Sequence, residues 1–510
     1  MSRPRGASRT EHDSLGDRQV PRWALYGAQT ARAVENYAIS GERAAPALIA
    51  AYGWLKWAMA QANRDFDLLP EKVAGAIAAA AREVAEHQLD EHFPVDVFQA
   101  GAGVSLHMNV NEVVANRAQE LLGGQRGHYE FVHPNDHVNR GQSTNDTFPT
   151  ALRVALRMEL DALLPVLQHC QRAFAAKGRQ FDRIVKAGRT HLQDAVPLRL
   201  GQEFAAYATA LGAARAEIAR AADVLLELGL GGSAAGTGLN TDPRVAPRAL
   251  RYLRQATGHR WRQAHDLCAA MQSQFPIAMA SAALRNLALE LIRICNDLRL
   301  LASGPMTGLR EIELPALQPG SSIMPGKVNP VMPEMLTMVA FQVVGNDAAT
   351  ALAVQAGQLE LNVMMPAMAY ATLRSGRLFT AAIAAFTKHC VIGIRARPER
   401  CAAYAQSTMA LATALTPALG YSRTAKLVQQ SLNTGRPVLD LALEQNLLPE
   451  PQLRELLDPA RAAGNARAPA TGARAGLRGP RDAPAAKRAA NSPRAVSAGR
   501  RSRAPAPNKS

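Results

Sequence analysis

One segment near the middle of the chain brings two hydroxyls, a cation and a carboxamide close together. Residues 320–330 read G-S-S-I-M-P-G-K-V-N-P, and the groups concerned are those of Ser321, Ser322, Lys327 and Asn329. Hydroxyl, ammonium and amide groups all donate hydrogen bonds, and the two glycines let the backbone turn sharply and approach a ligand closely. These properties predict a mobile loop that binds an anion.

Neither glycine-rich segment of the chain predicts a nucleotide site. In the loop, five residues rather than four separate Gly320 from Gly326, and Val328 follows the lysine where a Walker loop needs Ser or Thr. The segment 229–238 follows an amphipathic helical pattern instead of a strand, so it lacks the context of a dinucleotide fingerprint. We expect this second segment to be a helix-breaking turn.

Three polar, glycine-containing segments interrupt the helical patterns: residues 101–112, 133–146 and 304–330. In the second, Ser143, Thr144 and Asn145 offer two hydroxyls and an amide on successive residues, which suits a carboxylate together with an amine or a hydroxyl. Ser and Asn are also good helix N-caps, so one of the three could instead cap the helical run that follows. Both interpretations remain open at the level of sequence.

Four sequence blocks together resemble the class II fumarase/aspartase superfamily. They are M-N-V-N-E at 108–112, Q-S-T-N-D at 142–146, G-R-T-H-L-Q-D at 188–194 and the loop at 320–330. A chance match to the last block is improbable. The resemblance covers about residues 11–457 and leaves only the two ends of the chain outside.

The resemblance implies an elimination reaction on a four-carbon dicarboxylate. The hydrogen on Cβ is hardly acidic, and its loss puts a second negative charge on the adjacent carboxylate. Cationic groups and hydrogen-bond donors must therefore already lie beside that carboxylate. By resemblance, Ser321 takes the proton as general base, while Lys327 and Asn329 hold the carboxylate and stabilise the aci-carboxylate intermediate. Backbone N–H groups and positive charge aimed at the serine Oγ would be needed to lower its pKa.

Other matched positions are implied to bind substrate. Thr190 and His191 correspond to a Thr-His pair that contacts substrate and, in fumarases, helps to activate water. The implied binding set is completed by Ser143, Thr144, Asn145 and Ser322, with Val104 and Glu334 in supporting positions and His133, Asn135 and Asp136 at a secondary anion site. An isolated loop serine, exposed lysine or histidine is usually structural, but each of these lies inside a matched block.

Two positions depart from the family pattern. Val104 stands where both branches place a carboxylate-binding threonine, and Ala102 stands where fumarases carry serine. Loss of the hydroxyl donor would cost about 1–3 kcal/mol if part of a buried carboxylate stays unpaired. A shift of Ser105 could compensate.

Local sequence choices favour aspartate over malate as the substrate. Features typical of aspartases are S-T-N at 143–145, A-V-P at 195–197, V-M-P-E at 331–334 and G-Q-L at 357–359. Features typical of fumarases are Y-G-A-Q-T at 26–30, His191 and A-L-G-Y at 418–421. The expected activity is aspartate ammonia-lyase, with class II fumarate hydratase as the alternative.

The charge of the chain is concentrated at its C-terminus. Residues 461–510 hold twelve Lys/Arg and one acid, Asp482, so that +11 of the net +16 falls there and +5 remains for residues 1–460. This segment has almost no large apolar residues and is expected to be disordered. A third class of function follows from it, a catalytically silent family member with a nucleic-acid-binding tail, but solvation is the commoner role of such charge and a nucleic-acid partner is not expected.

Long helical patterns position these segments and predict an all-α, mainly α-helical fold. Leu156, Leu160, Leu163, Leu167, Cys170 and Phe174 share one helix face, as do Leu211, Ala214, Ile218, Ala221, Leu225 and Leu228. Further long helices are predicted at about 271–302, 333–355 and 365–389. The resemblance implies a homotetramer with a central twenty-helix core, in which each active site draws on three subunits.

The predicted divisions are an N-terminal lyase domain at 1–148, a central long-helix bundle at 149–400, a small helical domain at 401–460 and the basic tail at 461–510. The five cysteines show no C-x-x-C or C-x-x-H pairing, so buried reduced thiols are expected rather than disulfides or a metal site. No cofactor, membrane span or signal peptide is expected, which places the protein in the cytoplasm.

Overall fold

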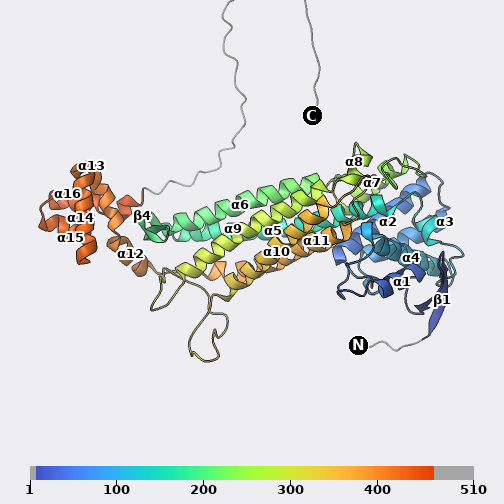
Figure 1. The fold of residues 1–510 in the computed structure, drawn as a ribbon, viewed down its shortest axis with the longest axis horizontal. Helices are drawn as coiled ribbons and strands as arrows, with labels where there is room; N and C mark the ends of the chain where they lie inside the picture. The colour runs from blue at the N-terminus through green and yellow to red at the C-terminus, as the bar shows by residue number, and fades with distance from the viewer. Residues whose placement is uncertain (1–6, 465–510) are drawn as a thin grey trace, which may run out of the picture. The chain divides into compact units, whose positions relative to one another are not determined.

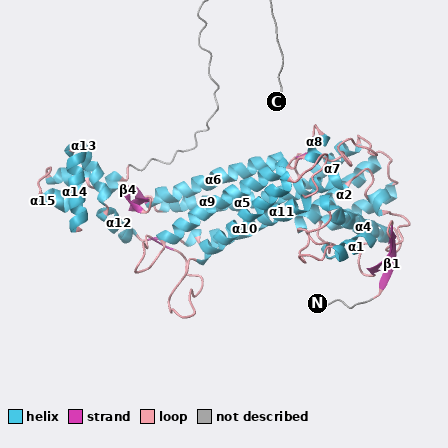
Figure 2. Cartoon of the chain, in the orientation of Figure 1, coloured by secondary structure: helices cyan, strands magenta, loops and turns pink. Residues whose placement is uncertain are grey.

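The computed structural model describes residues 7–464, and helices dominate them (Figure 2). The strands form four short two-stranded sheets: β1 Ser8–Asp13 with β2 Gly16–Pro21, β3 Val185–Thr190 with β4 Gln193–Arg199, β5 Glu227–Leu228 with β6 Arg262–Gln263, and β7 Ile312–Glu313 with β8 Arg395–Ala396. Only the β5–β6 pair is parallel among these. The predicted all-α class is confirmed.

The first helices pack around the start of the central bundle. They are α1 Ala28–Asn36, α2 Pro46–Asp65, α3 Glu71–Ala85 and α4 Val104–Leu121. Helices α2 and α3 approach closely at Gly53, where a Cβ atom would lie 2.4 Å from the backbone nitrogen of Ala85. This contact requires glycine because the obstruction is backbone, which cannot give way easily.

Five long helices form the central bundle (Figure 1): α5 Thr144–Gln180, α6 Leu200–Val224, α9 Phe275–Leu301, α10 Val331–Gln355 and α11 Met365–His389. Helix α5 packs against α6 and α11, and α9 packs against α6 and α10. Both predicted apolar faces are buried, including Leu156 to Phe174 on α5 and Leu211 to Leu228 along α6 and β5. The periodicity therefore located the core correctly.

The boundaries of one predicted helix were wrong. The run expected at 271–302 is divided, because Met271 belongs to the short helix α8 Leu267–Gln272 and α9 begins only at Phe275. Pro276 lies in the first turn of α9, where its missing N–H has no intrahelical partner to lose.

The remaining helices flank the bundle. Helix α7 Val245–Thr257 packs on α2, and the C-terminal helices are α12 Pro398–Ser407, α13 Thr416–Leu419, α14 Tyr421–Thr434, α15 Val438–Glu444, α16 Glu450–Leu456 and α17 Pro459–Ala462. The C-terminal group has its own apolar cluster around Leu415, Leu441 and Leu453. Residues 7–464 belong to one compact unit, and the proposed division at 148, 400 and 460 stays a prediction. The predicted basic tail lies outside the described residues from 465 onward.

Two helices within residues 7–464, α9 and α10, are long and apolar enough to cross a membrane by length and composition alone. Both are bundle helices, and buried core helices pass the same test, so this is weak evidence for a span. The thiol prediction holds for Cys170, Cys295, Cys390 and Cys401, which are buried and free. It is wrong for Cys268, which is free but exposed.

Candidate active site

The first of the predicted site segments begins helix α5. Ser143 is the N-cap: its Oγ accepts a hydrogen bond from the Asn145 backbone N–H at 3.2 Å, and its own N–H donates to Asp146 Oδ1 at 3.0 Å. The helix-capping interpretation is therefore correct for Ser143. Thr144 and Asn145 are half-buried on the first turn, where polar side chains meet the positive end of the helix dipole.

The glycine-rich segment 229–238 cradles this helix start. Asp146 is fully buried and also accepts backbone N–H groups of Gly231 and Ser233, both at 3.1 Å, while the Asn145 side-chain amide donates to the Ala234 carbonyl at 2.8 Å. Burial raises the pKa of Asp146 to about 6, and the three N–H bonds act in the opposite direction. The sequence was interpreted here as a simple turn, so this positioning role was missed.

A buried lysine lies behind the same helix start. The Nζ of Lys56, on α2, contacts His107 Nε2 at 2.9 Å, Asn139 Oδ1 at 3.2 Å and Gln142 Oε1 at 2.9 Å. His107 Nδ1 in turn lies 2.7 Å from Thr144 Oγ1. Burial lowers the pKa of both Lys56 and His107 well below their usual values. The sequence signals this group only by placing a lysine among the mostly apolar residues 44–60.

The M-N-V-N-E block is structural in this chain. Glu112 is buried and accepts hydrogen bonds from the backbone N–H groups of Gly27, Gln29 and Thr30, which fixes the start of α1 on α4. Burial raises the pKa of Glu112 to about 7. Asn109 likewise donates to the His92 carbonyl at 2.9 Å. This block therefore supports the segments that carry site residues.

The segment 320–330 lies in the long loop between α9 and α10 (Figure 2). Ser321 Oγ accepts backbone N–H groups of Ile323 at 3.2 Å and Met324 at 3.0 Å. The loop is closed at its base, since the Gly320 N–H donates to the Lys327 carbonyl at 2.7 Å. A Cβ atom at Gly320 would lie 2.6 Å from that carbonyl oxygen, so the closure needs glycine.

The cationic and amide groups of this loop have different environments. Ser322 and Lys327 are exposed, and Asn329 is half-buried with its side-chain amide donating to the Gly320 carbonyl at 2.7 Å. Glu334 is half-buried in the first turn of α10, directly after the loop.

Thr190 and His191 lie at the tip of the β3–β4 hairpin. Thr190 pairs with Gln193, and both turn residues between them, His191 and Leu192, have positive φ values of 56° and 60°. Such a turn normally takes Asn or Gly, so two side chains here carry backbone strain of a kind found at functional sites. Thr190 and His191 are exposed.

An ion network holds the base of this hairpin. The Glu311 carboxylate is fully buried and lies 2.9 Å from both Lys186 Nζ and Arg189. Lys186 also pairs with Glu203 at 2.9 Å, and the Arg189 guanidinium stacks over Tyr404 of α12. The network fixes the residue that precedes Thr190, so the exposed tip projects from a rigid base.

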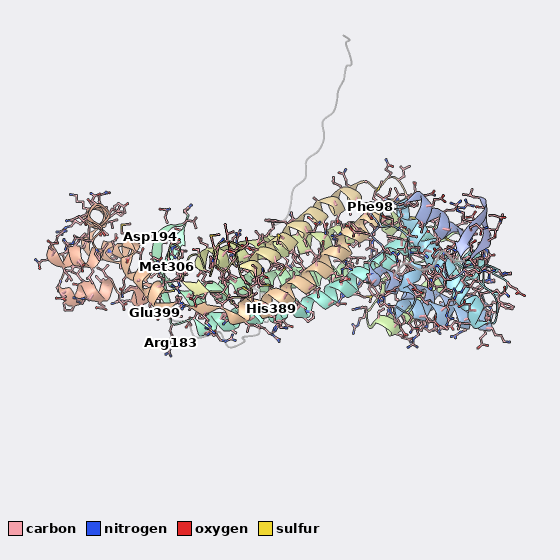
Figure 3. The ribbon with its side chains drawn as sticks, turned by 90° about the horizontal axis from the view of Figure 1, so that it is seen from below. Phe98, Arg183, Asp194, Met306, His389 and Glu399 are labelled. Carbon is pink, nitrogen blue, oxygen red and sulfur yellow. The ribbon has the colours of Figure 1, made fainter. Side chains whose placement is uncertain are left out.

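These segments lie at opposite ends of the bundle. Thr190 and the last turn of α9, at Leu300 and Leu301, line one cleft, and the loop 302–330 leaves the bundle from that turn. Figure 3 places Asp194 of the hairpin and Met306 of the loop at one end and Phe98, which precedes α4, at the other. A straight helix of the length of α5 spans roughly 50 Å. Within one chain, residues 143–145 therefore lie far from both the tip of the β3–β4 hairpin and the loop 320–330.

Comparisons with known proteins decide the family. Residues 16–345 match a family model described as Lyase, and residues 411–462 match one described as Fumarase C C-terminus. The chain belongs to the fumarase/aspartase family of lyases. Its predicted family membership is thus confirmed.

Relatives of this lyase fall into both branches of the family. Aspartate ammonia-lyase from Pseudomonas fluorescens is 46% identical, over 88% of this chain and 95% of its own length. Class II fumarate hydratase from Thermus thermophilus is also 46% identical, over 89% of this chain and 98% of its own length.

Solved structures of the family share the fold. The crystal structure of fumarate lyase:delta crystallin from Brucella melitensis bound to cobalt has a TM-score of 0.87 at 46% identity, covering 90% of this chain and all of that chain. Class II fumarase from Schistosoma mansoni has a TM-score of 0.87 at 37% identity, covering 90% and 99%.

Val104, at which this lyase departs from the family pattern, lies on the surface of the chain. Val104 is the first residue of α4 and is 41% exposed, whereas Ser105 and Ala102 are buried. Ala102 also has a positive φ of 61°. The Ser105 hydroxyl is therefore turned into the protein in this conformation, and the exposed position has no hydroxyl.

The proposed secondary anion site lies on a π-helical turn, Pro134–Val138. His133 Nδ1 accepts the Asp136 backbone N–H at 3.2 Å, and Asn135 and Asp136 are exposed. The structure brings His133, Asn135 and Asp136 together on one turn. Across the part of the lyase that the structure describes, no group of three or more His, Cys, Asp or Glu side chains is placed to hold a metal ion.

Proposed function

We propose that this lyase catalyses the reversible elimination of ammonia from L-aspartate to give fumarate. The observation that carries the proposal is the environment of Ser321, whose Oγ accepts two backbone N–H bonds inside a loop that also presents the Lys327 ammonium. These donors stabilise an oxyanion at Oγ, as a serine general base requires. The similarity to aspartate ammonia-lyases from several bacteria supports the choice of substrate.

The chemistry runs in two steps. Ser321 Oγ, as the oxyanion, removes a proton from Cβ, and the electron pair of the C–H bond moves into the adjacent carboxylate to form the aci-carboxylate. Lys327 and Asn329 share the second negative charge on that group. The electron pair then returns to form the Cα=Cβ double bond as the Cα–N bond breaks, and the amine leaves with its proton as ammonia or ammonium.

The other segments bind the remaining groups of the substrate. Thr144 and Asn145 supply a hydroxyl and an amide at a positive helix end, which suits a carboxylate. Thr190 and His191 project from the hairpin toward the leaving group. No cofactor enters this scheme, because the charge that develops is carried by side-chain and backbone donors.

The active enzyme is a homotetramer in which several subunits share each site. The separation of residues 143–145 from residues 190–191 and 321–329 supports this, since only another copy of the chain can bring them together. Helix α10 also exposes large apolar side chains on a single chain, with Met338, Phe341 and Leu352 each 59–66% exposed. Packing such helices around a common axis would bury them. The cytoplasm is the compartment proposed for this assembly.

Class II fumarate hydratase is the second candidate, because a relative with that activity is equally similar. Purified protein given L-aspartate in one cuvette and L-malate in another, with fumarate followed by its ultraviolet absorbance, separates the two. Faster formation of fumarate from L-aspartate is expected. Turnover of L-malate alone would replace the proposed activity with the hydratase.

Turnover of neither substrate would leave the third candidate, a silent family member whose basic residues 461–510 bind nucleic acid. In that case DNA binding should weaken steeply with salt and vanish when those residues are removed. We expect instead that the truncated and full-length proteins turn over L-aspartate equally.

A further inference from the structure

The three hydrogen-bond partners of Lys56 are neutral groups. A charged ammonium has three hydrogens and no acceptor, and Lys56 finds acceptors on His107, Asn139 and Gln142 at 2.9–3.2 Å. The side chain is 1% exposed, so water cannot replace any of these partners. Every donor of the charged lysine is therefore used, which is the condition for keeping such a group buried.

In its charged form, Lys56 fixes the direction of the hydrogen bonds that follow. An ammonium can only donate, so His107 Nε2 must accept and the ring hydrogen must sit on Nδ1. Nδ1 then donates to Thr144 Oγ1 at 2.7 Å. Because this oxygen already accepts a bond, the hydroxyl hydrogen of Thr144 points elsewhere, and the half-buried side chain can present it to a ligand.

The histidine ring is held in the orientation that this chain of bonds needs. Tyr52 stacks on His107 with ring centroids 5.6 Å apart and planes inclined by 16°. The titratable groups that face the cluster are Tyr52 and Lys56 on α2, His107 on α4 and Asp146 on α5. Asp146 is the single acid among them, and its charge acts on Lys56 in favour of the ammonium.

We propose that Lys56 and His107 are positioning residues for the substrate, which make the Thr144 hydroxyl a hydrogen-bond donor to a substrate carboxylate. Lys56 acts through His107, and neither residue touches the substrate. If Lys56 loses its proton, the chain can reverse, and Thr144 then donates to His107 and offers the ligand only a lone pair. This inference rests on the proposed function, because it assigns Thr144 to a dicarboxylate site.

A matched pair of substitutions at His107 tests the direction of the bonds. The amide nitrogen of asparagine can occupy the position of Nδ1, whereas the amide of glutamine reaches the position of Nε2. His107→Asn therefore keeps a hydrogen-bond donor to Thr144. His107→Gln keeps the hydrogen bond with Lys56 but loses the one with Thr144. We expect KM for L-aspartate to rise about 10- to 100-fold in His107→Gln, as for a lost bond to a charged group, and to stay within about threefold of the parent in His107→Asn.

A purely structural cluster would give a different result. Both substitutions would then lower the thermal unfolding temperature without separating KM from kcat, and equal KM values in the two variants overturn the proposal. Lys56→Met supplies a second measurement, for which we expect a similar rise in KM. The double variant Lys56→Met/Thr144→Val should show no further rise beyond that of Thr144→Val alone. Fully additive effects in the double variant would also overturn it.

The pH dependence of KM gives a signature that stability cannot produce. As pH rises through the pKa of Lys56, which burial has lowered, the parent should lose the Thr144 donor and its KM should rise. In Thr144→Val, KM should not show this rise at alkaline pH (the alkaline limb of the KM profile), because the variant has no hydroxyl to reorient. The proposal fails if the limb persists unchanged in that variant.

The failure of the proposed function is distinguishable from the failure of this inference. A parent enzyme that turns over neither L-aspartate nor L-malate defeats the function, and calorimetric binding of succinate then compares the same variants. Succinate affinity that is retained in His107→Asn and lost in His107→Gln supports the inference on its own. An active parent whose His107 variants match in KM defeats only the inference.

Discussion

The two ends of the helix bundle differ in how their candidate site residues are supported and exposed. At the start of α5, Thr144 and Asn145 are backed by the buried Lys56 and His107 and by the glycine-rich segment 229–238. At the opposite end, Lys327 and His191 are exposed. The side chains at the first end are supported by buried groups of the same chain, whereas those at the second end are presented at its surface.

This difference suits the roles that the proposed function assigns to the two ends, substrate binding at one and proton removal at the other. Binding groups gain from rigidity, since preorganised donors lose no entropy when a ligand arrives. Reactive groups on a loop and a hairpin tip can instead move to enclose the substrate and exclude water. The bases of both exposed segments are nevertheless fixed, the hairpin by the buried Glu311 carboxylate and the loop by the closure of Gly320 on Lys327.

The largest expected effect is a loss of kcat on substitution at the exposed end of the bundle. Ser321→Ala should lower kcat for L-aspartate by about 10²- to 10⁴-fold, because the general base is lost. Ser322→Ala is the matched control, with the same atom removed from the next residue, and should act mainly on KM. Steady-state assays of both variants check this. A Ser321→Ala enzyme with parental kcat would remove the base from the mechanism.

Mixing two damaged enzymes tests whether the two ends meet between chains. Asn145→Ala should be nearly inactive because it removes an amide from the binding end. If each site takes Ser321 from one subunit and Asn145 from another, equal mixtures of Ser321→Ala and Asn145→Ala subunits should recover about one quarter of parental activity by random assembly. Activity is measured after reversible dissociation and reassembly. A mixture no more active than its parts would place both residues in the same chain's site.

A gain is expected at the binding end from Val104→Thr. The side chains have the same shape, and the 41% exposure of Val104 leaves room for a hydroxyl to meet a ligand. KM for L-aspartate should fall by about 5- to 10-fold, corresponding to one added hydrogen bond. Ser105→Ala, one residue away but buried, should leave KM unchanged. A lower activity in Ser105→Ala would instead show that Ser105 substitutes for the missing threonine.

The smallest expected effect is on stability at the buried end. Burial lowers the pKa of His107 below its usual 6.5, so below that pH the unfolded chain binds a proton that the folded chain does not. Stability of the parent should therefore fall as pH drops below about 6.5, and His107→Asn should reduce this slope. Urea unfolding at neutral pH and near pH 5, at one protein concentration, measures it.

Asp146 acts in the opposite direction over part of this range. Its pKa is raised to about 6, so the folded chain takes up a proton before the unfolded chain does, and its contribution to stability grows as pH falls. This contribution is present in both proteins and cancels in their comparison. Equal slopes for the parent and His107→Asn would contradict the lowered pKa of His107.

Much of the fold followed from local patterns. The stripe from Leu156 to Phe174 predicted a buried face because side chains spaced by three and four residues share one side of a helix. The start of α9 was missed because helical periodicity does not mark where one helix ends and the next begins, and the effect of Pro276 was not considered. Boundaries depend on one or two residues, and periodicity averages over many.

The candidate site was only partly predictable. The donors in residues 320–330 were recognisable because they are adjacent in the chain, but the two N–H bonds to Ser321 depend on the folded turn. The support of Asp146 by Gly231 and Ser233 was missed, since 85 and 87 residues separate the partners. No short-range pattern reports such a contact.

The sequence by itself predicted the long helices and carried the blocks that resemble the family, because both depend on residues that are close together in the chain. Tertiary structure decided which groups are buried and which end of the bundle each one occupies. Lys56 illustrates the reason: it is 51 residues from His107, and only packing of α2 against α4 and α5 turns an ordinary lysine into a dry, fully hydrogen-bonded side chain. Burial and electrostatic environment arise from such distant contacts, which spacing along the chain does not encode.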